Sequence, residues 1–415
     1  MNWQIGFLFK GDKVIWMVLF IFCMISIVEV FSASSVLTYK SQDYLRPVVF
    51  HTFTIIVGVV VAIIIQNVPY GYFRLMIPSL LLFSLATLLW VILAGTKVGD
   101  AGRWIKLLGL TFQPSEIAKG TIVLTVAQVL AFFQRENGAD KNAFKWILWI
   151  TIPICILIGL ENLSTGAMLF FVVFLMMFLG LVPLKQLAKL ASSIILIGVI
   201  ALAMIMLVGH DISDEDKDLA KVEQIEKPQE KSLVDKIFHR LDTWKSRIIK
   251  FCKPMPAPEN YDLEKDGQVA HANIAIVTSG LLGKGPGKST ERDFLPQAFS
   301  DFIYAIIIEE LGLLGAFSVA FLFMILLIRC GRIANRCGKT FPAFLVMGLG
   351  ILLATQALFN MMVAVGLAPV TGQPLPLISK GGTSTIINYA YIGMILSVSR
   401  YSLKKGYARK ELQSS

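Results

Sequence analysis

The stretch that decides the fold runs from Ser279 to Gly315 and reads SGLLGKGPGKSTERDFLPQAFSDFIYAIIIEELGLLG. Its first half is polar and rich in glycine, and after Ser300 it becomes an apolar helical pattern that opens with a carboxylate, Asp301. We therefore predict a membrane span that begins beside Asp301. This carboxylate has two possible interpretations. An ionisable group in a membrane span indicates a functional site, and a charge at a helix start can also simply face the lipid headgroups.

The composition is that of a membrane protein. Of the 415 residues, 55% are hydrophobic and only 16% are charged, and the mean hydropathy is +0.69. Apolar runs long enough to cross a bilayer recur along the chain, which excludes an ordinary soluble enzyme. The net charge of +10 comes from Lys and Arg in loops beside the spans, so we expect the membrane, and no nucleic acid, as a partner.

We predict an all-α integral membrane protein with about ten transmembrane helices and one large extracytoplasmic loop between spans seven and eight. Lys and Arg gather in the loops on the side of both termini, which the positive-inside rule makes cytoplasmic. The expected spans are 14–33, 47–66, 73–94, 114–133, 145–161, 164–183, 188–209, 302–328, 343–366 and 383–400. The expected regions are the cytoplasmic N-terminus 1–13, spans one to seven within 14–209, the outer loop 210–300, spans eight to ten within 301–402 and the cytoplasmic tail 403–415.

We expect no catalytic or ligand-binding role for Glu29 or for three of the cysteines. Glu29 stands alone among apolar residues of the first span, and we expect it to reach the outer headgroups by snorkelling. Cys252, Cys330 and Cys337 are expected in loops, without CxxC or Cys/His ligand spacing, so neither a zinc site nor a disulfide framework is implied.

The fourth span opens with a charged pair. Glu116 and Lys119 lie three residues apart after Pro114, so they share one helical face and can pair with each other or with a polar ligand in a cavity. Trp104, in the preceding outer loop, is either a residue of the interfacial aromatic belt or part of a site.

Two connections carry further signals. The stretch from Gly366 to Ser384 holds three prolines and four glycines, yet it is apolar, so we expect it to be buried in protein or to line a cavity and to border a site. The turn from Glu161 to Ala167 is explained by helix capping, with a cavity-lining role as the alternative.

The run from Gly283 to Ser289 resembles a phosphate-binding loop, but Leu282 stands where that motif needs glycine, so we reject nucleotide binding.

These dispersed motifs together resemble the SEDS family over nearly the whole chain. The matching residues are Arg103-Trp104 with Gln113 to Lys119, then Phe294-Leu295-Pro296 through Asp301 to Gly312, then Pro369 to Gly372 and Ser379 to Ser384. The resemblance implies a peptidoglycan glycosyltransferase that polymerises lipid II at the outer face of the cytoplasmic membrane. It implies a place at the division septum, with a class B penicillin-binding protein and other division proteins as partners and undecaprenyl-diphosphate-linked glycan as the growing chain.

The same resemblance assigns the site. Asp301 falls on the family's essential aspartate and is the expected general base, because an acceptor hydroxyl must lose its proton as it attacks the anomeric carbon. The expected substrate-binding residues are Arg103, Trp104, Glu116, Lys119 and Lys284. The resemblance implies no certain cofactor and leaves a divalent cation open.

The chain also departs from the family pattern. Glu161-Asn162-Leu163-Ser164-Thr165 stands where the family has Pro-Asp-Leu-Gly-Thr, and Phe299-Ser300 stands for His-Thr. Lys380 replaces a tyrosine, and His271 replaces the second glutamine of a Gln-x-x-Gln pattern. Alternatives to the septal polymerase are the elongation polymerase of the same family, a flippase for lipid-linked precursors and a non-enzymatic scaffold. A flippase needs charge along a path across the bilayer, whereas the expected site residues gather toward the outer half.

Overall fold

The protein is described from a computed structural model, which covers residues 9–33, 46–94, 96–98, 101–107, 110–136, 138–208, 245, 249, 263–295 and 298–414. It divides into two compact units: residues 1–183, 262–367 and 371–415 form the first, and residues 184–261 and 368–370 the second. The helix α9 (Leu184–Val208) is the long apolar element of the second unit. All site residues discussed below belong to the first unit.

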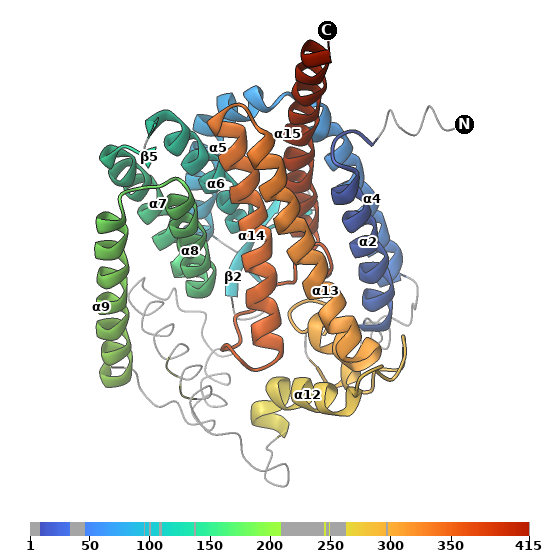
Figure 1. Cartoon of the computed structure of the whole chain (residues 1–415). Helices are drawn as coiled ribbons and strands as arrows, with labels where there is room; N and C mark the ends of the chain where they lie inside the picture. Colours follow the sequence, from blue (N-terminus) through green and yellow to red (C-terminus); the bar gives the residue numbers. More distant parts are fainter. Residues whose placement is uncertain are drawn as a thin grey trace. The chain divides into compact units, whose positions relative to one another are not determined.

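The first unit is a bundle of long apolar helices (Figure 1). Together with α9, they occupy the place of each expected span. They are α2 (Lys13–Ala33), α4 (Arg46–Asn67), α5 (Tyr70–Ala94), α6 (Pro114–Phe133), α7 (Lys141–Glu161), α8 (Leu163–Leu179), α13 (Ile303–Arg336), α14 (Thr340–Ala364) and α15 (Thr383–Ser414).

The fold class is confirmed as an all-α, multi-pass membrane protein. Within the described residues, seven helices are long and apolar enough to cross a bilayer: α2, α4, α5, α6, α7, α13 and α14. The helix α8 is apolar but has only 17 residues. The total of ten spans and the position of the outer loop stay predictions.

Helices α6 and α14 form the centre of the bundle. They pack against each other, and most of their residues are buried, whereas α4, α5 and α7 expose much of their apolar surface, as lipid-facing helices do. Small residues allow close packing at the edge: a Cβ added at Gly393 of α15 would lie 3.0 Å from the Ala62 backbone of α4. Because lipid offers no hydrophobic driving force between helices, this packing holds the bundle together.

One end of the bundle collects basic residues. The Lys10 ammonium and the Arg400 guanidinium both donate to the Asn67 side chain, at 3.1 and 3.2 Å. The Arg329 guanidinium pairs with the Asp12 carboxylate at 2.8 Å. The start of α2 and the end of α15 therefore lie at the same end of the bundle, at the top of Figure 1, as an even number of spans predicts. We refer to this as the basic end.

The connection between α5 and α6 contains a small sheet that we did not expect. Strands β1 (Thr96–Val98), β2 (Ala101–Leu107) and β3 (Leu110–Phe112) pair antiparallel in chain order, with Trp104 opposite Thr96 and Ile105 opposite Phe112. At the basic end, β4 (Gln134–Arg135) and β5 (Gly138–Ala139) form a short hairpin. Such pairing satisfies backbone groups where the chain leaves a helix.

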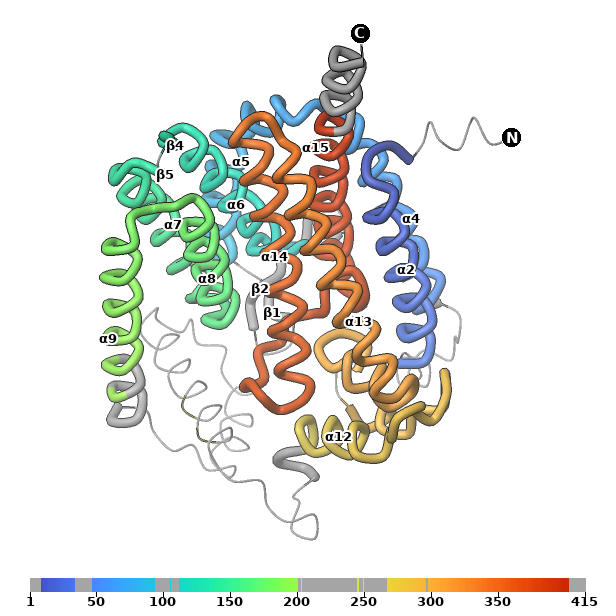
Figure 2. The backbone as a smooth tube through the Cα atoms, in the orientation of Figure 1, coloured from blue at the N-terminus to red at the C-terminus, as the bar shows by residue number. Residues whose placement is uncertain are grey.

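The segment before α13 contains a helix, α12 (Leu263–Ser279), and a 3₁₀ turn, η2 (Glu291–Asp293). The tube in Figure 2 follows α12 into the loop that precedes α13. Most of the predicted loop 210–300 is not among the described residues. This part precedes α12 and includes Cys252.

Two expectations about single residues are wrong. Glu29 does not reach the headgroups: it is fully buried, because α2 packs against α13 and leaves its side chain no path to water. Cys330 does not lie in a loop, because α13 continues to Arg336 and buries the thiol within the helix. Cys337 caps the C-terminus of α13 and is partly exposed.

Candidate active site

Asp301 lies directly before α13, at the end of the bundle opposite the basic end. The helix begins at Ile303 with Phe302 as its N-cap, and the Asp301 side chain is partly exposed. The Ser300 hydroxyl donates to the Asp301 carboxylate at 3.1 Å. A negative charge near a helix N-terminus interacts favourably with the helix dipole.

The backbone beside Asp301 is held by the buried connection between α14 and α15. The Ser379 hydroxyl donates to the Ser300 carbonyl oxygen at 2.6 Å and accepts from the Leu375 N–H at 2.8 Å. Leu375, Leu377, Ile378 and Ser379 are all nearly inaccessible to solvent. The expectation that this non-helical, apolar stretch is buried in protein is confirmed for residues 371–379, which border Asp301, whereas Gly366, Leu367 and Pro369 are exposed.

Asn360 of α14 joins three parts of this region. Its side-chain N–H groups donate to the Asp301 carbonyl oxygen and to the Gln373 carbonyl oxygen, both at 2.8 Å. The Gln373 side chain in turn donates to the Thr165 hydroxyl of α8 at 3.0 Å. The backbone of Asp301 is thus held directly by a side chain of α14 and indirectly, through Asn360 and Gln373, by α8.

Glu116 and Lys119 form the predicted pair. The Lys119 ammonium lies 2.8 Å from the Glu116 carboxylate, and both residues are buried, at 1% and 3% exposure. The ammonium also donates to the Gln356 side chain of α14 at 3.0 Å, and Gln356 donates to the Pro374 carbonyl oxygen at 3.4 Å. The pair therefore belongs to the same hydrogen-bonded network as the connection beside Asp301.

The network leaves three buried acceptors without a hydrogen bond from any described residue. They are the second carboxylate oxygen of Glu116 and the side-chain oxygens of Asn360 and Gln373. The start of α6 is meanwhile anchored to α15, because the Tyr391 hydroxyl donates to the Glu116 carbonyl oxygen and accepts from the Gly120 N–H. The pair is thus rigidly held while keeping a polar atom unsatisfied by the described protein.

The turn after α7 behaves as a cap. The Asn162 side chain accepts from the Ser164 N–H at 3.2 Å, which caps α8, and donates to the Thr371 carbonyl oxygen at 3.2 Å. Glu161 is buried beside it. The capping interpretation is confirmed, and the turn also contacts the connection that borders Asp301.

Two departures from the family pattern touch each other. The Lys380 ammonium lies 5.2 Å from the centre of the Phe299 ring, and the Lys380 N–H donates to the Phe299 carbonyl oxygen at 3.0 Å. Burial lowers the pKa of the Lys380 ammonium below its ordinary value. A cation–π pair therefore places a positive charge within the segment that leads to Asp301.

The glycine-rich loop before Asp301 is bound to α13 by two buried glutamates. The Lys284 ammonium pairs with the Glu309 carboxylate at 2.6 Å and donates to the Thr290 hydroxyl at 2.9 Å. The Glu309 carboxylate also accepts from the Thr290 N–H at 3.0 Å, and the Glu310 carboxylate from the Gly287 N–H at 2.8 Å. Backbone N–H groups that could hold a phosphate are thus occupied by the chain's own carboxylates, in agreement with the rejection of nucleotide binding.

The loop can lie this close only because of glycine. Gly283 has φ +75°, and a Cβ there would collide with the Glu310 carbonyl oxygen. Gly312, also at positive φ, interrupts α13 opposite the loop. This close approach allows the Lys284 N–H to donate to the Glu309 carbonyl oxygen at 2.9 Å.

We expect Gly283→Ala to destabilise the protein, because the left-handed conformation alone costs a residue with a Cβ about 1–2 kcal/mol and the collision adds to this. The measurement is the thermal unfolding midpoint of the purified protein in detergent. Gly71→Ala is the matched control, since a Cβ at Gly71 meets nothing within 4 Å. Equal midpoints for the two variants would contradict the packing described for the loop.

Arg103 and Trp104 are placed only by their backbone. Both lie on β2, which contacts α5, α6 and α7, and their side chains fall outside the described part of the structure. Their role in substrate binding stays a prediction. Among the described residues, no three His, Cys, Asp or Glu side chains gather to hold a metal ion. A divalent cation at Asp301 would therefore draw most of its oxygen ligands from substrate phosphates and water.

The polar residues of α14 are the part of the site that sequence reasoning missed. Gln356 and Asn360 lie four residues apart in an apolar helix, so they share one face. Polar residues in a span are themselves a signal of function or packing. That signal was available, but the partners of these side chains come from distant parts of the chain.

Comparisons with known proteins agree with this architecture. The family model FTSW_RODA_SPOVE, described as cell cycle protein, matches residues 12–404. A probable peptidoglycan glycosyltransferase FtsW from Trichlorobacter lovleyi is 31% identical over 90% of this chain and 89% of its own. The FtsW relative from Geobacter metallireducens is 28% identical over 94% of this chain and 95% of its own.

Solved structures share the fold. A chain from a peptidoglycan synthase complex that coordinates polymerization and crosslinking matches with a TM-score of 0.67 and 22% identity, over 94% of this chain and 98% of that one. The rod shape determining protein RodA of Thermus thermophilus matches with a TM-score of 0.61 and 21% identity, over 96% and 98% of the two chains. With a family model covering nearly its whole length, this chain belongs to the FtsW/RodA/SpoVE family, the SEDS family.

Proposed function

We propose that this protein is a peptidoglycan glycosyltransferase that polymerises lipid II at the outer face of the cytoplasmic membrane, for septal wall synthesis in cell division. The observation that carries the proposal is the carboxylate of Asp301, partly exposed at the entry to α13, with its backbone fixed by Asn360. The two relatives named FtsW support the activity and favour the division role over elongation.

The proposed chemistry needs one base. The acceptor sugar hydroxyl attacks the anomeric carbon of the donor, its proton passes to the Asp301 carboxylate, and the bond from that carbon to the diphosphate oxygen breaks, with inversion. The leaving group is undecaprenyl diphosphate, which departs without a second carboxylic acid to protonate it, unlike the leaving group in glycoside hydrolysis. Cations beside the diphosphate stabilise the charge that develops on it.

The cationic side chains proposed to stabilise the diphosphate differ in how many of their donors are already bonded within the protein. Lys119 already donates to Glu116 and Gln356, so its third N–H and the open oxygen of Glu116 are what the pair offers a substrate. Lys284 is partly exposed and tied to Glu309, which makes it a contact at the edge of the site. We add Lys380 to the predicted set, because this half-buried lysine belongs to the same connection as Ser379, whose hydroxyl donates to the carbonyl oxygen of the residue before Asp301. Arg103 and Trp104 remain proposed contacts from β2.

The orientation proposed is with both termini cytoplasmic and Asp301 outside. The basic end contains Arg329, near the C-terminus of α13, and Asp301 directly precedes the N-terminus of α13. Basic residues favour the cytoplasmic side. This supports an outer position for Asp301 and for the outer loop 210–300.

Cysteine labelling tests the orientation. A membrane-impermeant thiol reagent is expected to label Cys252 in intact spheroplasts and to reach Cys337 only after permeabilisation. Cys23 and Cys330 are buried, so they contribute little signal. A Cys252→Ser variant identifies the outer label, and the reverse pattern would overturn the orientation.

A polymerisation assay tests the function itself. Purified protein with lipid II, with and without a class B penicillin-binding protein, is expected to yield long glycan strands on a gel. The partner is proposed because the structural neighbour comes from a peptidoglycan synthase complex. A flippase would move lipid II across vesicles without lengthening it, and a scaffold would do neither. Transport without polymer in the presence of the partner would therefore exclude the proposed activity.

A further inference from the structure

A cavity lies at the basic end, far from Asp301. Three helix ends form it: the start of α5 through Arg74, the end of α6 through Gln128, Ala131 and Phe132, and the start of α14 through Thr340 and Phe341. Gly338 and Lys339, between α13 and α14, complete the wall, and the cavity volume is about 490 Å³. None of these residues belongs to the proposed active site.

The cavity favours an anion. Arg74 and Lys339 are exposed, and neither forms an ion pair with any residue in the described ranges. Lys339 is also the N-cap of α14 and gives that helix no side-chain cap bond. The two side-chain charges thus face the same space as the first N–H groups of α14, whose dipole adds to the positive potential.

The remaining lining favours a lipid over a small soluble anion. Phe132 is 73% exposed, and Ala131 and Phe341 extend the apolar wall, beside the half-buried amide of Gln128. An anionic group and apolar chains are the parts of an anionic glycerophospholipid.

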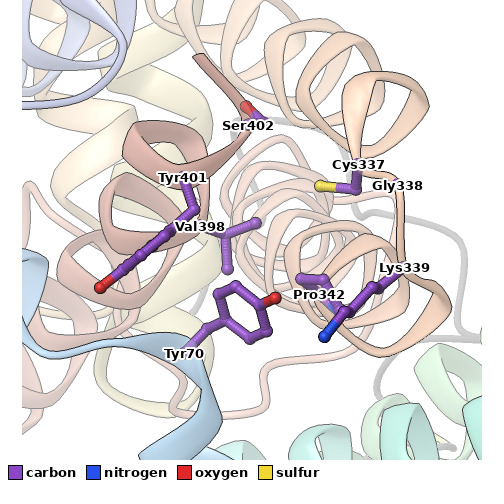
Figure 3. A pocket seen from close by; sticks show the side chains of 8 residues that line it. All are labelled: Tyr70, Cys337, Gly338, Lys339, Pro342, Val398, Tyr401 and Ser402. Atoms are coloured by element: carbon purple, nitrogen blue, oxygen red, sulfur yellow. The ribbon is translucent and has the colours of Figure 1, made fainter. Parts of the chain in front are cut away.

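An adjoining cavity of about 390 Å³ continues the site (Figure 3). Gly338 and Lys339 line both cavities, and the second adds Tyr70, Pro342, Val398 and Tyr401. Figure 3 shows the Tyr70 hydroxyl and the Lys339 ammonium directed toward the same part of the cavity, with Val398 facing it. The rings of Tyr70 and Tyr401 pack edge to face at 5.4 Å, an arrangement suited to the membrane interface.

We propose that these two cavities bind one anionic glycerophospholipid, such as phosphatidylglycerol. The phosphodiester lies between Arg74 and Lys339, and the acyl chains leave along Phe132. The site depends on the chain's place in a membrane and is independent of glycosyl transfer. A free phosphate shares the anionic chemistry but lacks the chains.

Native mass spectrometry of the detergent-purified full chain tests the proposal with phosphatidylglycerol and phosphatidylcholine of equal acyl length. The parent is expected to retain phosphatidylglycerol preferentially. Arg74→Gln with Lys339→Gln is expected to weaken that binding about 10- to 30-fold, because each basic residue near an anionic headgroup raises the affinity about fivefold. The charge-preserving variant Arg74→Lys with Lys339→Arg is expected to keep most of it.

The matched control is Lys141→Gln with Lys145→Gln, which removes two exposed charges from the start of α7 at the same end of the bundle, outside both cavities. Unchanged binding in this control supports a defined site. An equal loss in the control, or equal phosphatidylglycerol binding by the parent and the Arg74/Lys339 variant, overturns it. Millimolar inorganic phosphate is expected to leave the lipid adduct in place, and displacement by phosphate would reject a lipid as the ligand.

Discussion

Asp301→Asn is expected to lower lipid II polymerisation by at least about 10²- to 10⁴-fold, the usual contribution of general base catalysis. The amide keeps the size of the carboxylate and can still accept from the Ser300 hydroxyl, but it cannot take a proton. The anchoring of this segment uses the backbone carbonyl oxygens of Ser300 and Asp301, which the substitution leaves unchanged. Folding and membrane insertion should therefore match the parent, as judged by yield and unfolding midpoint.

Asp301→Glu separates basicity from position. The base survives but lies about one bond further from its present place, so a small residual activity above that of Asp301→Asn is expected. The same polymerisation assay measures it. If Asp301→Glu were no more active than Asp301→Asn, the comparison would show that the position of the carboxylate matters. It would then not show that Asp301 acts as a base.

Lys119→Ala is expected to have the largest effect on stability. It leaves the Glu116 carboxylate buried without its partner, and breaking a buried ion pair in this way costs about 3–5 kcal/mol. It also removes the donor to Gln356, which helps to position the connection beside Asp301. The measurement is the unfolding midpoint and yield in detergent, with Lys145→Ala, an exposed lysine of α7, as the matched control.

The double variant Glu116→Gln with Lys119→Met distinguishes support from substrate binding. With both charges gone, much of the stability lost in Lys119→Ala should return, because no uncompensated charge stays buried. Activity should remain low if the pair also contacts substrate, and it should recover with stability if the pair only supports the fold. Wild-type stability and activity in both single alanine variants would remove the pair from the account.

Local patterns in the sequence predicted much of this region correctly. The three-residue spacing of Glu116 and Lys119 placed them on one helical face, and they pair. The apolar yet proline- and glycine-rich stretch between α14 and α15 was expected to be buried at membrane depth, and residues 371–379 are largely buried. In both cases the controlling interaction is local or follows from the membrane environment.

The long-range contacts could not be predicted in the same way. Gln356, Asn360 and Thr165 are joined through residues far away in the chain, so their partners depend on how the helices pack. Glu29 was expected at the surface because its position along the span was considered without the neighbouring α13, which covers it. The Lys380–Phe299 contact joins two departures from the family pattern that looked independent in the sequence.

The most direct test of the central claim compares Asp301→Asn with Asp293→Asn in one lipid II polymerisation assay, each with the class B penicillin-binding protein present. Asp293 is an exposed carboxylate of the same outer segment, on η2, so the two variants remove the same charge a short distance apart in the chain. The account predicts glycan synthesis near the parent rate for Asp293→Asn and at least about a hundredfold loss for Asp301→Asn. Asp301→Asn activity within a few-fold of the parent would contradict it and leave Asp301 as a helix-start charge facing the headgroups.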